Sequence, residues 1–581
     1  MIDLRTIPFT IADTMPPLLG RDTLDEGAET TLIGHALSLI GKKYRTITLS
    51  DYREYNLTGN RSHYQNLVEE RNTDLSDLLF AAFYDEGQQF IPPLLDLLYL
   101  ITGETAWWLP AHNLYQRDVR TNDYPDTTRP VICIHATETA ALLATAVTLL
   151  KDKLPAETVT HVKAEIERRI FSPYETFHFW WMGDGVEKVN NWGPWCVQNV
   201  LLCYALLVDD KERKRKAIAQ AVKTLQFFLD GYGEDGGCEE GPNYYHHAAC
   251  SLFASLWVLD MMTDNAFSNV YQERKIRNMA SFIEKAHIKD DWYVNFSDGP
   301  ARLEPNGLNV YLFAKATGNG NLMAFVQNDW KRQDKETRLL LSTRFILERI
   351  MTNRTYTEAM ASQKNYQERE VTDHFPSIGL HVFKTKTYVL AVNAGNNGVS
   401  HNHNDTGSVI LFKGGKPVLI DVGVETYTKK TFSPERYAIW TMQDRYHNLT
   451  AFTPYHQDPG ERFKATDIHA TVHTITMELK DAYQKELRLT GYKRSVTISN
   501  EGVTIKDEVR CGEKHVFTMM SLFPPERTEK GIMMGNAEIT APGTPETEAI
   551  PLTDMQLRAS WGETIYRTRI PYNETIEVHI V

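Results

Sequence analysis

The sequence is poor in cysteine and has no cysteine pair at metal-binding spacing. Its 581 residues include only 6 cysteines, and no two of them form a C-x-x-C arrangement. A disulfide-stabilised secreted scaffold or a zinc ribbon would need paired cysteines. We therefore expect all six thiols to be reduced and buried, with no chemical role.

Long apolar runs and an export signal are also missing from the chain as given. The first residues, MIDLRTIPFTIADTMPPLLG, contain no basic segment followed by an apolar core. No later run approaches the roughly 20 apolar residues of a membrane span. We expect a cytoplasmic protein without a membrane partner.

Positive charge is in deficit. The 62 lysines and arginines face 75 aspartates and glutamates, which gives a formal net charge of −13. Such a balance argues against nucleic acid as a partner, because phosphate backbones are bound by basic surfaces. An anionic ligand would have to be held by a local group of residues.

Two different hydrophobic periods divide the chain. From about Glu29 to Met351 the spacing is helical, as in TAALLATAVTLL, CVQNVLLCYALLV and ETRLLLSTRFILERI. Several of these helices are apolar around most of their circumference, as expected of inner helices covered by an outer ring. After about residue 355 the period becomes two, with Lys/Gly and Asn/Gly turns. The pattern predicts an incomplete α/α toroid over residues 1–355 and an antiparallel β-sandwich over residues 356–581.

The first candidate motif is VNNWGPWCVQN. Pro194 suits the first turn of a helix with Gly193 at its cap, which places Asn190, Asn191 and Trp192 in the preceding loop. A carboxamide at the rim of a toroid can donate hydrogen bonds to a carboxylate or an oxyanion. The alternative is that the asparagines only shape the turn.

The second motif, DGGCEEGPNYYHHAAC, also has Gly-Pro at the expected start of a helix. Tyr245 falls on an apolar stripe, whereas Tyr244 falls on a more polar face. Tyr244 is therefore the better candidate to present its hydroxyl to a cleft. There it could donate a proton, or accept one if its phenol were activated.

The third motif, HNHND, precedes an expected β-hairpin with KGGK as its turn. This turn pairs Phe412 with Pro417 and Ser408 with Asp421, so that Asp421 lies at the end of the hairpin that carries the histidines. His447 could join them, and the combined nitrogen and oxygen ligands suit zinc or manganese. A hydrogen-bonded polar turn is the alternative. The H-x-H spacing also invites comparison with cupins, but the glutamate of the first cupin motif is missing.

These three stretches, in this order, resemble the heparinase II/III family of polysaccharide lyases. The matching pieces are NNW, DGGCEEGPNYY, HNHND, LIDVG and His447-Asn448, with weaker echoes in WWLPAHN and HATETAALLA. The resemblance spans nearly the whole chain. It implies a toroid followed by a β-sandwich, and β-elimination on uronate-containing polysaccharides.

The resemblance also implies roles for individual residues. Asn191 would bind the uronate carboxyl group, Tyr244 would move protons at C5 and O4, and His401 would act as base or as a second carboxylate neutraliser. The divalent zinc or manganese ion would organise the site rather than activate water. Its ligands would be His403, Asp421 and His447.

One departure and several weaker candidates complete the site prediction. Many family members have Asn-His where this chain has Asn191-Trp192, so a proton acceptor is missing and base duty shifts to Tyr244 or His401. An arginine near the cleft could form a fork onto a carboxylate or a sulfate. The candidate substrate-binding residues are Asn190, Trp192, Trp108, His112, Glu138 and Arg436.

The leading hypothesis is a lyase for glycosaminoglycans or related anionic oligosaccharides, with exolytic action favoured. A glycoside hydrolase is the main alternative, and it would need two carboxylates ~5–9.5 Å apart across the cleft. A sugar-binding protein without activity is the other, and it would not need Tyr244. The oligomeric state stays open.

Overall fold

The chain divides into a helical unit and a β-sheet unit, and each is built from several stretches of sequence. The structure is a computed structural model that describes residues 3–113, 122–332, 345–361 and 365–581. The helical unit comprises Met1–Tyr232, His246–Ala280 and Pro305–Tyr366. The β-sheet unit comprises Gly233–Tyr245, Ser281–Glu304 and Gln367–Val581. The second unit therefore includes Tyr244, although the sequence prediction put a single boundary near residue 355.

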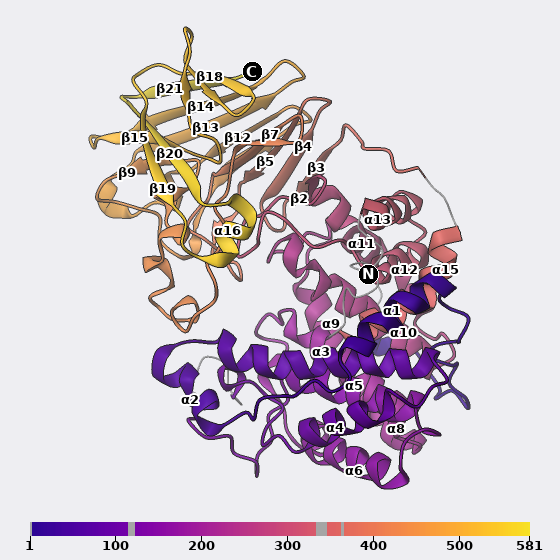
Figure 1. Cartoon of the computed structure of the whole chain (residues 1–581). Helices are drawn as coiled ribbons and strands as arrows, with labels where there is room; N and C mark the ends of the chain where they lie inside the picture. Colours follow the sequence, from indigo (N-terminus) through magenta and orange to yellow (C-terminus); the bar gives the residue numbers. More distant parts are fainter. Residues whose placement is uncertain (1–2, 114–121, 333–344, 362–364) are drawn as a thin grey trace. The chain divides into compact units, whose positions relative to one another are not determined.

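The predicted order of helices followed by strands is confirmed (Figure 1). Most of the described helices belong to the helical unit, and α11 (Arg274–Ala286) runs from it into the second unit. The sequence also predicts a helix in ETRLLLSTRFILERI. The part of this stretch up to residue 344 lies outside the described residues, and the part from Ile346 onward is helical. The helices of the first unit are α1 (Glu26–Ser38), α2 (Leu49–Thr58), α3 (Ser62–Tyr84), α4 (Ile91–Thr102), α5 (Ile134–Leu149), α6 (Ala156–Ile166), α7 (Ser172–Thr176), α8 (Trp192–Leu207), α9 (Lys211–Gly231), α10 (Ala249–Met262), α12 (Leu308–Ala316), α13 (Gly320–Arg332) and α15 (Ile346–Ala361).

Helix α8 is one of the enclosed helices that the sequence singles out. It packs against α5, α9 and α10, and 12 of its 16 residues are buried. This agrees with the apolar circumference that the sequence shows, because a helix covered on all sides has no polar face. None of the described helices combines the length and the apolar character that a membrane crossing requires.

At the first Gly-Pro pair Pro194 lies in the first turn of a helix, as predicted, but Gly193 is not the cap, and the second pair does not begin an α-helix. Helix α8 begins at Trp192 with Asn191 at its N-cap, so Gly193 lies inside the first turn. A Cβ at Gly193 would stand 2.5 Å from the Val189 side chain, so close packing explains the glycine better than capping does. At the other pair, Pro242 opens only a 3₁₀ turn, η5 (Pro242–His246), and α10 starts later at Ala249.

The β-sheet unit contains three larger antiparallel sheets among its described residues, which confirms the predicted period of two. The five-stranded sheet has the order β3 (Thr372–Phe375), β4 (Leu380–Lys384), β5 (Tyr388–Asn393), β7 (Val409–Lys413) and β8 (Lys416–Leu419). The eight-stranded sheet has the order β11 (Thr466–Ala470), β12 (Thr474–Glu478), β13 (Gly491–Ile498), β14 (Val503–Arg510), β21 (Thr575–Ile580), β18 (Ala537–Thr540), β17 (Ile532–Met534) and β16 (Glu526–Arg527). The four-stranded sheet has the order β19 (Glu546–Pro551), β20 (Thr564–Tyr572), β15 (His515–Ser521) and β9 (Thr450–Phe452).

Smaller elements complete this unit. Helix α16 (Met555–Trp561) follows β19. Strand β1 (His287–Lys289) pairs with β2 (Trp292–Tyr293), and β6 (Asn396–Asn397) pairs with β10 (Gly460–Lys464).

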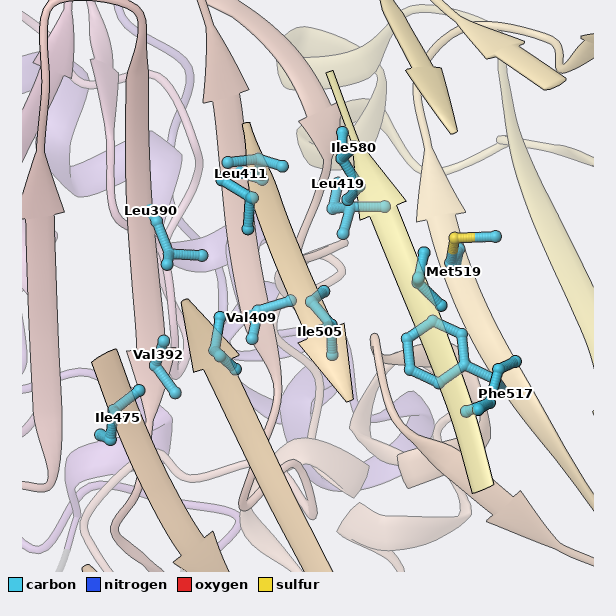
Figure 2. Packing of buried hydrophobic residues seen from close by; sticks show 14 of the residues in the cluster. Leu390, Val392, Val409, Leu411, Leu419, Ile475, Ile505, Phe517, Met519 and Ile580 are labelled. Carbon is cyan, nitrogen blue, oxygen red and sulfur yellow. The ribbon is translucent and has the colours of Figure 1, made fainter. Parts of the chain in front are cut away.

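One continuous apolar core joins these sheets. Side chains from the five-stranded sheet, such as Leu390 and Leu411, meet Ile505 and Ile580 of the eight-stranded sheet and Phe517 of β15 (Figure 2). All five are fully buried. Alternate residues of each strand point into this core, which is the physical origin of the period of two in the sequence. The core fixes the ends of the strands, and the site loops leave from those ends.

The hairpin after HNHND follows its predicted register only near the turn. Phe412 pairs with Pro417, as predicted, but the ladder then shifts by one residue, so that Leu411 pairs with Leu419. The predicted pairing of Ser408 with Asp421 is therefore wrong, because a bulge at Val418 adds one residue and β8 ends at Leu419. Asp421 still follows the strand directly.

Candidate active site and metal centre

A compact polar cluster lies within the β-sheet unit, built from segments far apart in the sequence. Tyr244 comes from the η5 turn, and His401 and His403 come from the loop between β6 and β7. Asp298 follows β2, and Tyr427 lies in the segment after β8. His401 has a φ of 59°, a backbone conformation that costs a residue with a side chain roughly 1 kcal/mol or more.

Asp298 is the centre of this cluster. One of its oxygens lies 2.9 Å from His401 Nδ1 and 3.1 Å from the Tyr427 hydroxyl. The other oxygen lies 3.1 Å from His403 Nε2 and 2.6 Å from Arg436 Nη2. Burial alone would raise the pKa of Asp298, but the hydrogen bonds from the two histidines and the charge of Arg436 outweigh burial and hold it well below its usual value. Asp298 is therefore an anion at neutral pH.

The anionic state of Asp298 fixes the roles of both histidines. A carboxylate only accepts hydrogen bonds, so His401 donates through Nδ1 and His403 donates through Nε2. The remaining nitrogen of each neutral ring then carries a lone pair. In His401 this atom is Nε2, and the side chain is 18% exposed. In His403 it is Nδ1, which is buried and has no hydrogen-bond partner.

His401 has the properties of a base. Burial would lower the pKa of its imidazole, but the hydrogen bond to Asp298 and the negative charge of Glu240 outweigh burial and raise it. A raised pKa makes the free lone pair on Nε2 a better proton acceptor. The buried carboxylate behind the ring also fixes its orientation, as in other carboxylate–histidine pairs.

Tyr244 stands beside His401 and is connected to Asp298 through a second tyrosine. Its ring stacks on the His401 imidazole with 4.6 Å between centroids. Its hydroxyl lies 2.7 Å from the Tyr427 hydroxyl, which donates to Asp298. Because Tyr427 has one proton and gives it to Asp298, Tyr244 donates to Tyr427 in the resting arrangement. Burial raises the pKa of Tyr427 well above its usual value, so this phenol keeps its proton.

The three predicted metal ligands come together on the other side of His403. The ligand atoms of His403, Asp421 and His447 all lie within 4.8 Å of one another, and all three side chains are buried. The Asp421 carboxylate lies 2.9 Å from His447 Nδ1. His447 Nε2 lies 3.1 Å from the Thr441 carbonyl and can donate to it, which leaves a lone pair on Nδ1.

These residues fit a divalent ion. The unpartnered Nδ1 of His403 is a ligand atom that no protein group satisfies, and its opposite nitrogen is held by Asp298. Metal-bound histidines usually have such an outer hydrogen bond to a carboxylate or a carbonyl. Two imidazoles and a carboxylate suit zinc, and manganese accepts the same atoms.

Charges within the metal centre agree with this assignment. Burial would lower the pKa of His447, but Asp421 outweighs burial and raises it to about 9. A neighbouring acid, Asp405, is also buried, and its Oδ2 has no hydrogen-bond partner. Burial raises the pKa of Asp405. The centre thus concentrates negative charge that a proton or a cation must balance.

Arg436 contacts Asp298 and the protein backbone. Its Nη2 lies 2.6 Å from Asp298, and its other contacts are the carbonyl oxygens of Asn402 and Thr431. The guanidinium is mostly buried. Its observed role is to hold the carboxylate and the HNHND loop, and contact with substrate stays a prediction.

The predicted residues of the first motif lie in the helical unit, and their position beside Tyr244 stays a prediction. Asn190 shapes the turn, because its side-chain oxygen accepts from the Trp192 backbone at 3.1 Å. Asn191 is buried at the N-cap of α8 but makes no capping hydrogen bond with its side chain.

The other predicted substrate-binding residues of the helical unit are buried. His112 packs edge-on against Trp192 with 4.7 Å between ring centroids, and burial holds its pKa well below the usual value. The Trp108 indole donates to the Tyr52 hydroxyl at 3.2 Å. Glu138 accepts from the Trp195 indole at 2.7 Å. Structural contacts thus engage all three residues, whereas Trp192 itself is partly exposed.

Three residues of the cluster were missed by the sequence interpretation. Asp298 stands in FSDGP, where a turn preceding Gly-Pro looks like an ordinary loop. Tyr427 gave no signal beyond its position after the hairpin. Asp405 is the last residue of HNHND, so its motif was noted but no role was assigned to it. Ser297, just before Asp298, has a positive φ. This backbone feature, which marks the turn as unusual, is visible only in the structure.

Comparisons with known proteins find similar folds along the whole chain and a family match over one part of it. Residues 368–541 match the family model "Heparinase II/III-like, C-terminal". No curated protein matches the sequence. The solved heparinase III superimposes with a TM-score of 0.63 at 12% identity, covering 100% of this chain and 88% of the other.

Two further solved structures have the same architecture. A mutant of the heparan sulfate lyase HepC from Pedobacter heparinus gives a TM-score of 0.55 at 12% identity, with 99% of this chain and 85% of the other covered. A point mutant of the chondroitin AC lyase from Streptomyces coelicolor gives 0.52 at 12% identity, with 95% and 83% covered. The predicted α/α toroid with an antiparallel β-sandwich is thereby confirmed. Residues 368–541 are thus similar to the C-terminal region of heparinase II/III-like proteins, and the chain has the fold of heparinase III along its length.

Proposed function

We propose that this chain is a polysaccharide lyase that cleaves glycosaminoglycans or related uronate-containing oligosaccharides by β-elimination. The observation that carries the proposal is the pairing of Tyr244 and His401. A phenol and an imidazole with an open lone pair stack on each other beside one buried carboxylate. This arrangement offers an acid and a base side by side, as an elimination requires.

The reaction removes a proton from C5 and breaks the bond between C4 and O4. The C5–H electron pair becomes the C4=C5 double bond, and the C4–O4 pair leaves on O4. His401 Nε2 is suited to accept the C5 proton, and the Tyr244 hydroxyl is suited to donate its proton to O4. Tyr427, bonded to Asp298, can turn its hydroxyl toward the resulting phenolate and stabilise it.

Neutralising the substrate carboxylate is the other requirement, because a proton next to a carboxylate is otherwise difficult to remove. Asn191 is proposed for this role. Its buried side chain lies at the start of α8. When bound at His403, Asp421 and His447, a zinc or manganese ion would supply a fixed positive charge that orders the loop. Those residues hold the loop and leave the proton transfers to Tyr244 and His401.

The carboxylates of the cluster argue against a glycoside hydrolase. A hydrolase needs one carboxylic acid that can donate a proton and a second carboxylate across the cleft. Asp298 is buried, accepts from His401, His403, Tyr427 and Arg436, and has a pKa well below its usual value. An acid in this state has no proton to give at neutral pH.

We further propose exolytic action on short oligosaccharides. The net charge of −13 means that the protein surface as a whole repels long polyanions. An anionic substrate must therefore be recognised by a local group of residues. Size analysis of early products distinguishes the two modes, because exolytic action releases only disaccharides at first.

The test is a panel of hyaluronan, chondroitin sulfates, heparan sulfate and alginate, monitored by ultraviolet absorbance. Elimination produces a conjugated C4=C5 bond that absorbs, and hydrolysis does not. We expect absorbance to rise with at least one uronate substrate, with and without preloaded zinc or manganese. New reducing ends without absorbance would replace the lyase by a hydrolase. If the protein binds a uronate substrate without cleaving it, and Tyr244→Phe binds equally well, the protein is a sugar-binding protein without activity.

A further inference from the structure

An exposed aromatic ring lies against the proposed catalytic pair. Phe432 is 43% exposed, which is high for a large apolar side chain. Its ring stands edge-on to Tyr427, with 5.0 Å between centroids, and to His401, with 6.4 Å. The exposed phenyl group therefore continues the series of rings formed by Tyr244, His401 and Tyr427.

The turn that carries Phe432 is anchored to the cluster. It is a 3₁₀ turn, η7 (Lys430–Phe432), preceded by Lys429. The Thr431 hydroxyl accepts from the Thr428 backbone at 3.0 Å, and the Thr431 carbonyl accepts from Arg436, which also holds Asp298. Because these contacts fix the backbone, the exposed ring is held in place beside His401.

The same turn has local positive charge in a strongly acidic protein. Lys429 and Lys430 are both exposed, and no ion pair of either is found among the described residues. The whole chain has a net charge of −13. Two uncompensated cations next to a catalytic cluster attract anions more strongly than the average surface of this chain does.

We propose that the turn Lys429–Phe432 is a substrate subsite that binds an anionic pyranose adjacent to the ring being cleaved. This inference rests on the proposed lyase function and adds the residues that recognise the neighbouring sugar. The phenyl face of Phe432 packs against the C–H face of the pyranose, and Lys429 and Lys430 attract its carboxylate or sulfate.

The chemistry of such a sugar matches both features of the turn. A pyranose has one face rich in C–H groups, which gains contact and dispersion energy on a flat aromatic ring. Its carboxylate or sulfate is solvated at the edge, where flexible lysine ammonium groups interact as point charges without fixed geometry. The subsite is therefore expected to contribute affinity for charged oligosaccharides rather than to the chemical step.

The first experiment measures turnover of the preferred uronate oligosaccharide by Phe432→Ala. We expect KM to rise about 5- to 30-fold, with kcat within about threefold of the wild type, because ground-state and transition-state contacts are lost equally. Phe432→Trp should keep KM within about threefold, since it preserves a flat apolar face. Phe177→Ala is the matched control, because Phe177 is also 43% exposed, and it should leave both constants unchanged.

The second experiment tests the two charges. Lys429→Gln combined with Lys430→Gln should raise KM about 3- to 10-fold at ~0.05 M salt, and the difference should vanish near ~1 M salt, where the screening length falls to roughly 3 Å. Lys480→Gln combined with Lys485→Gln removes the same charge from two other exposed lysines and should not change KM. Equal effects of the two double variants would overturn the local role of the turn.

Failure of the subsite and failure of the lyase assignment give different results. If Tyr244→Phe abolishes turnover while Phe432→Ala leaves KM unchanged, the subsite is wrong and the lyase stands. If Phe432→Ala lowers kcat as much as kcat/KM, the ring acts in the chemical step and the subsite is again wrong. If the wild type forms no conjugated product from any uronate substrate, the function itself is wrong, and the subsite is rejected with it.

Discussion

The two sides of Asp298 use the same kind of residue for different purposes. His401 and His403 are two residues apart, and both donate a hydrogen bond to this carboxylate. On the first side the imidazole is partly exposed and stacks on Tyr244. On the second side the imidazole is fully buried, and its ligand atom lies close to those of Asp421 and His447.

The difference shows that the free nitrogen decides the role of each histidine. His401 keeps Nε2 available near solvent, where a substrate proton can reach it. His403 keeps Nδ1 buried and without a hydrogen-bond partner, close to the ligand atoms of Asp421 and His447. One buried anion sets both tautomers, so the catalytic side and the metal side depend on each other through Asp298.

The largest expected effect is on the catalytic side alone. Tyr244→Phe should lower kcat by about 10³- to 10⁴-fold, because the proton donor for O4 is lost while the ring stack is kept. The midpoint of urea unfolding and the metal content should match those of the wild type. Steady-state ultraviolet assays, urea titration and metal analysis of the same sample measure all three quantities. A loss of less than about tenfold would remove Tyr244 from the chemistry.

The next largest effect should reach both sides at once. Asp298→Asn leaves Arg436 as a buried charge without its carboxylate, which costs about 3–5 kcal/mol of the free energy of unfolding. Urea denaturation measures this loss, and metal content and turnover should fall with it. Asp291→Asn is the control, because its pair with Arg302 is exposed and contributes less than about 1 kcal/mol. Similar unfolding midpoints for the two variants would contradict the central place of Asp298.

A third prediction concerns how the stability of the metal centre depends on pH. In chelator-treated protein, the raised pKa of His447 stabilises the fold fully below about pH 6.5, and this contribution is lost as pH rises toward about 9. The loss should be on the order of 3 kcal/mol across that range, since each unit of pKa corresponds to about 1.4 kcal/mol. Metal-loaded protein should not lose it, because the ion replaces the proton. Thermal unfolding of both forms at about pH 6 and about pH 9 is the measurement, and identical slopes would count against the assignment.

The smallest effect concerns the tyrosine that links the two sides. Tyr427→Phe removes the hydroxyl between Tyr244 and Asp298 and should lower kcat about tenfold, with KM nearly unchanged. Tyr446→Phe is a suitable control, because the Tyr446 ring packs against Trp440 and Arg567 in the same sheet unit. If both variants keep full turnover, Tyr427 does not support Tyr244.

Local sequence patterns predicted the metal centre better than they predicted the catalytic side. The HNHND motif, the hairpin and His447 are close in sequence, so strand geometry could bring His403 and Asp421 together even though a bulge shifts the register. Asp298 lies more than a hundred residues before His403 in a short turn. No periodicity connects two such segments, because only the folded core determines which loops meet.

The fold itself was more predictable than the loops. The periods of 3.6 and two are direct consequences of burying one face of a helix or a strand, and both are observed. The predicted cap at Gly193 and the predicted helix start at Pro242 were wrong, because Gly-Pro also suits a 3₁₀ turn or a close approach of a neighbouring side chain to the backbone. Tyr244 belongs to the β-sheet unit, and nothing in the sequence around it indicates this.

The most direct test of the central claim compares His401→Ala with His403→Ala in one experiment. Turnover of a uronate oligosaccharide and bound zinc or manganese are measured on the same preparations. We predict that His401→Ala loses at least about 100-fold in kcat and keeps its ion, whereas His403→Ala loses its ion. Loss of the ion in His401→Ala, or full retention of the ion in His403→Ala, would contradict the division of roles around Asp298.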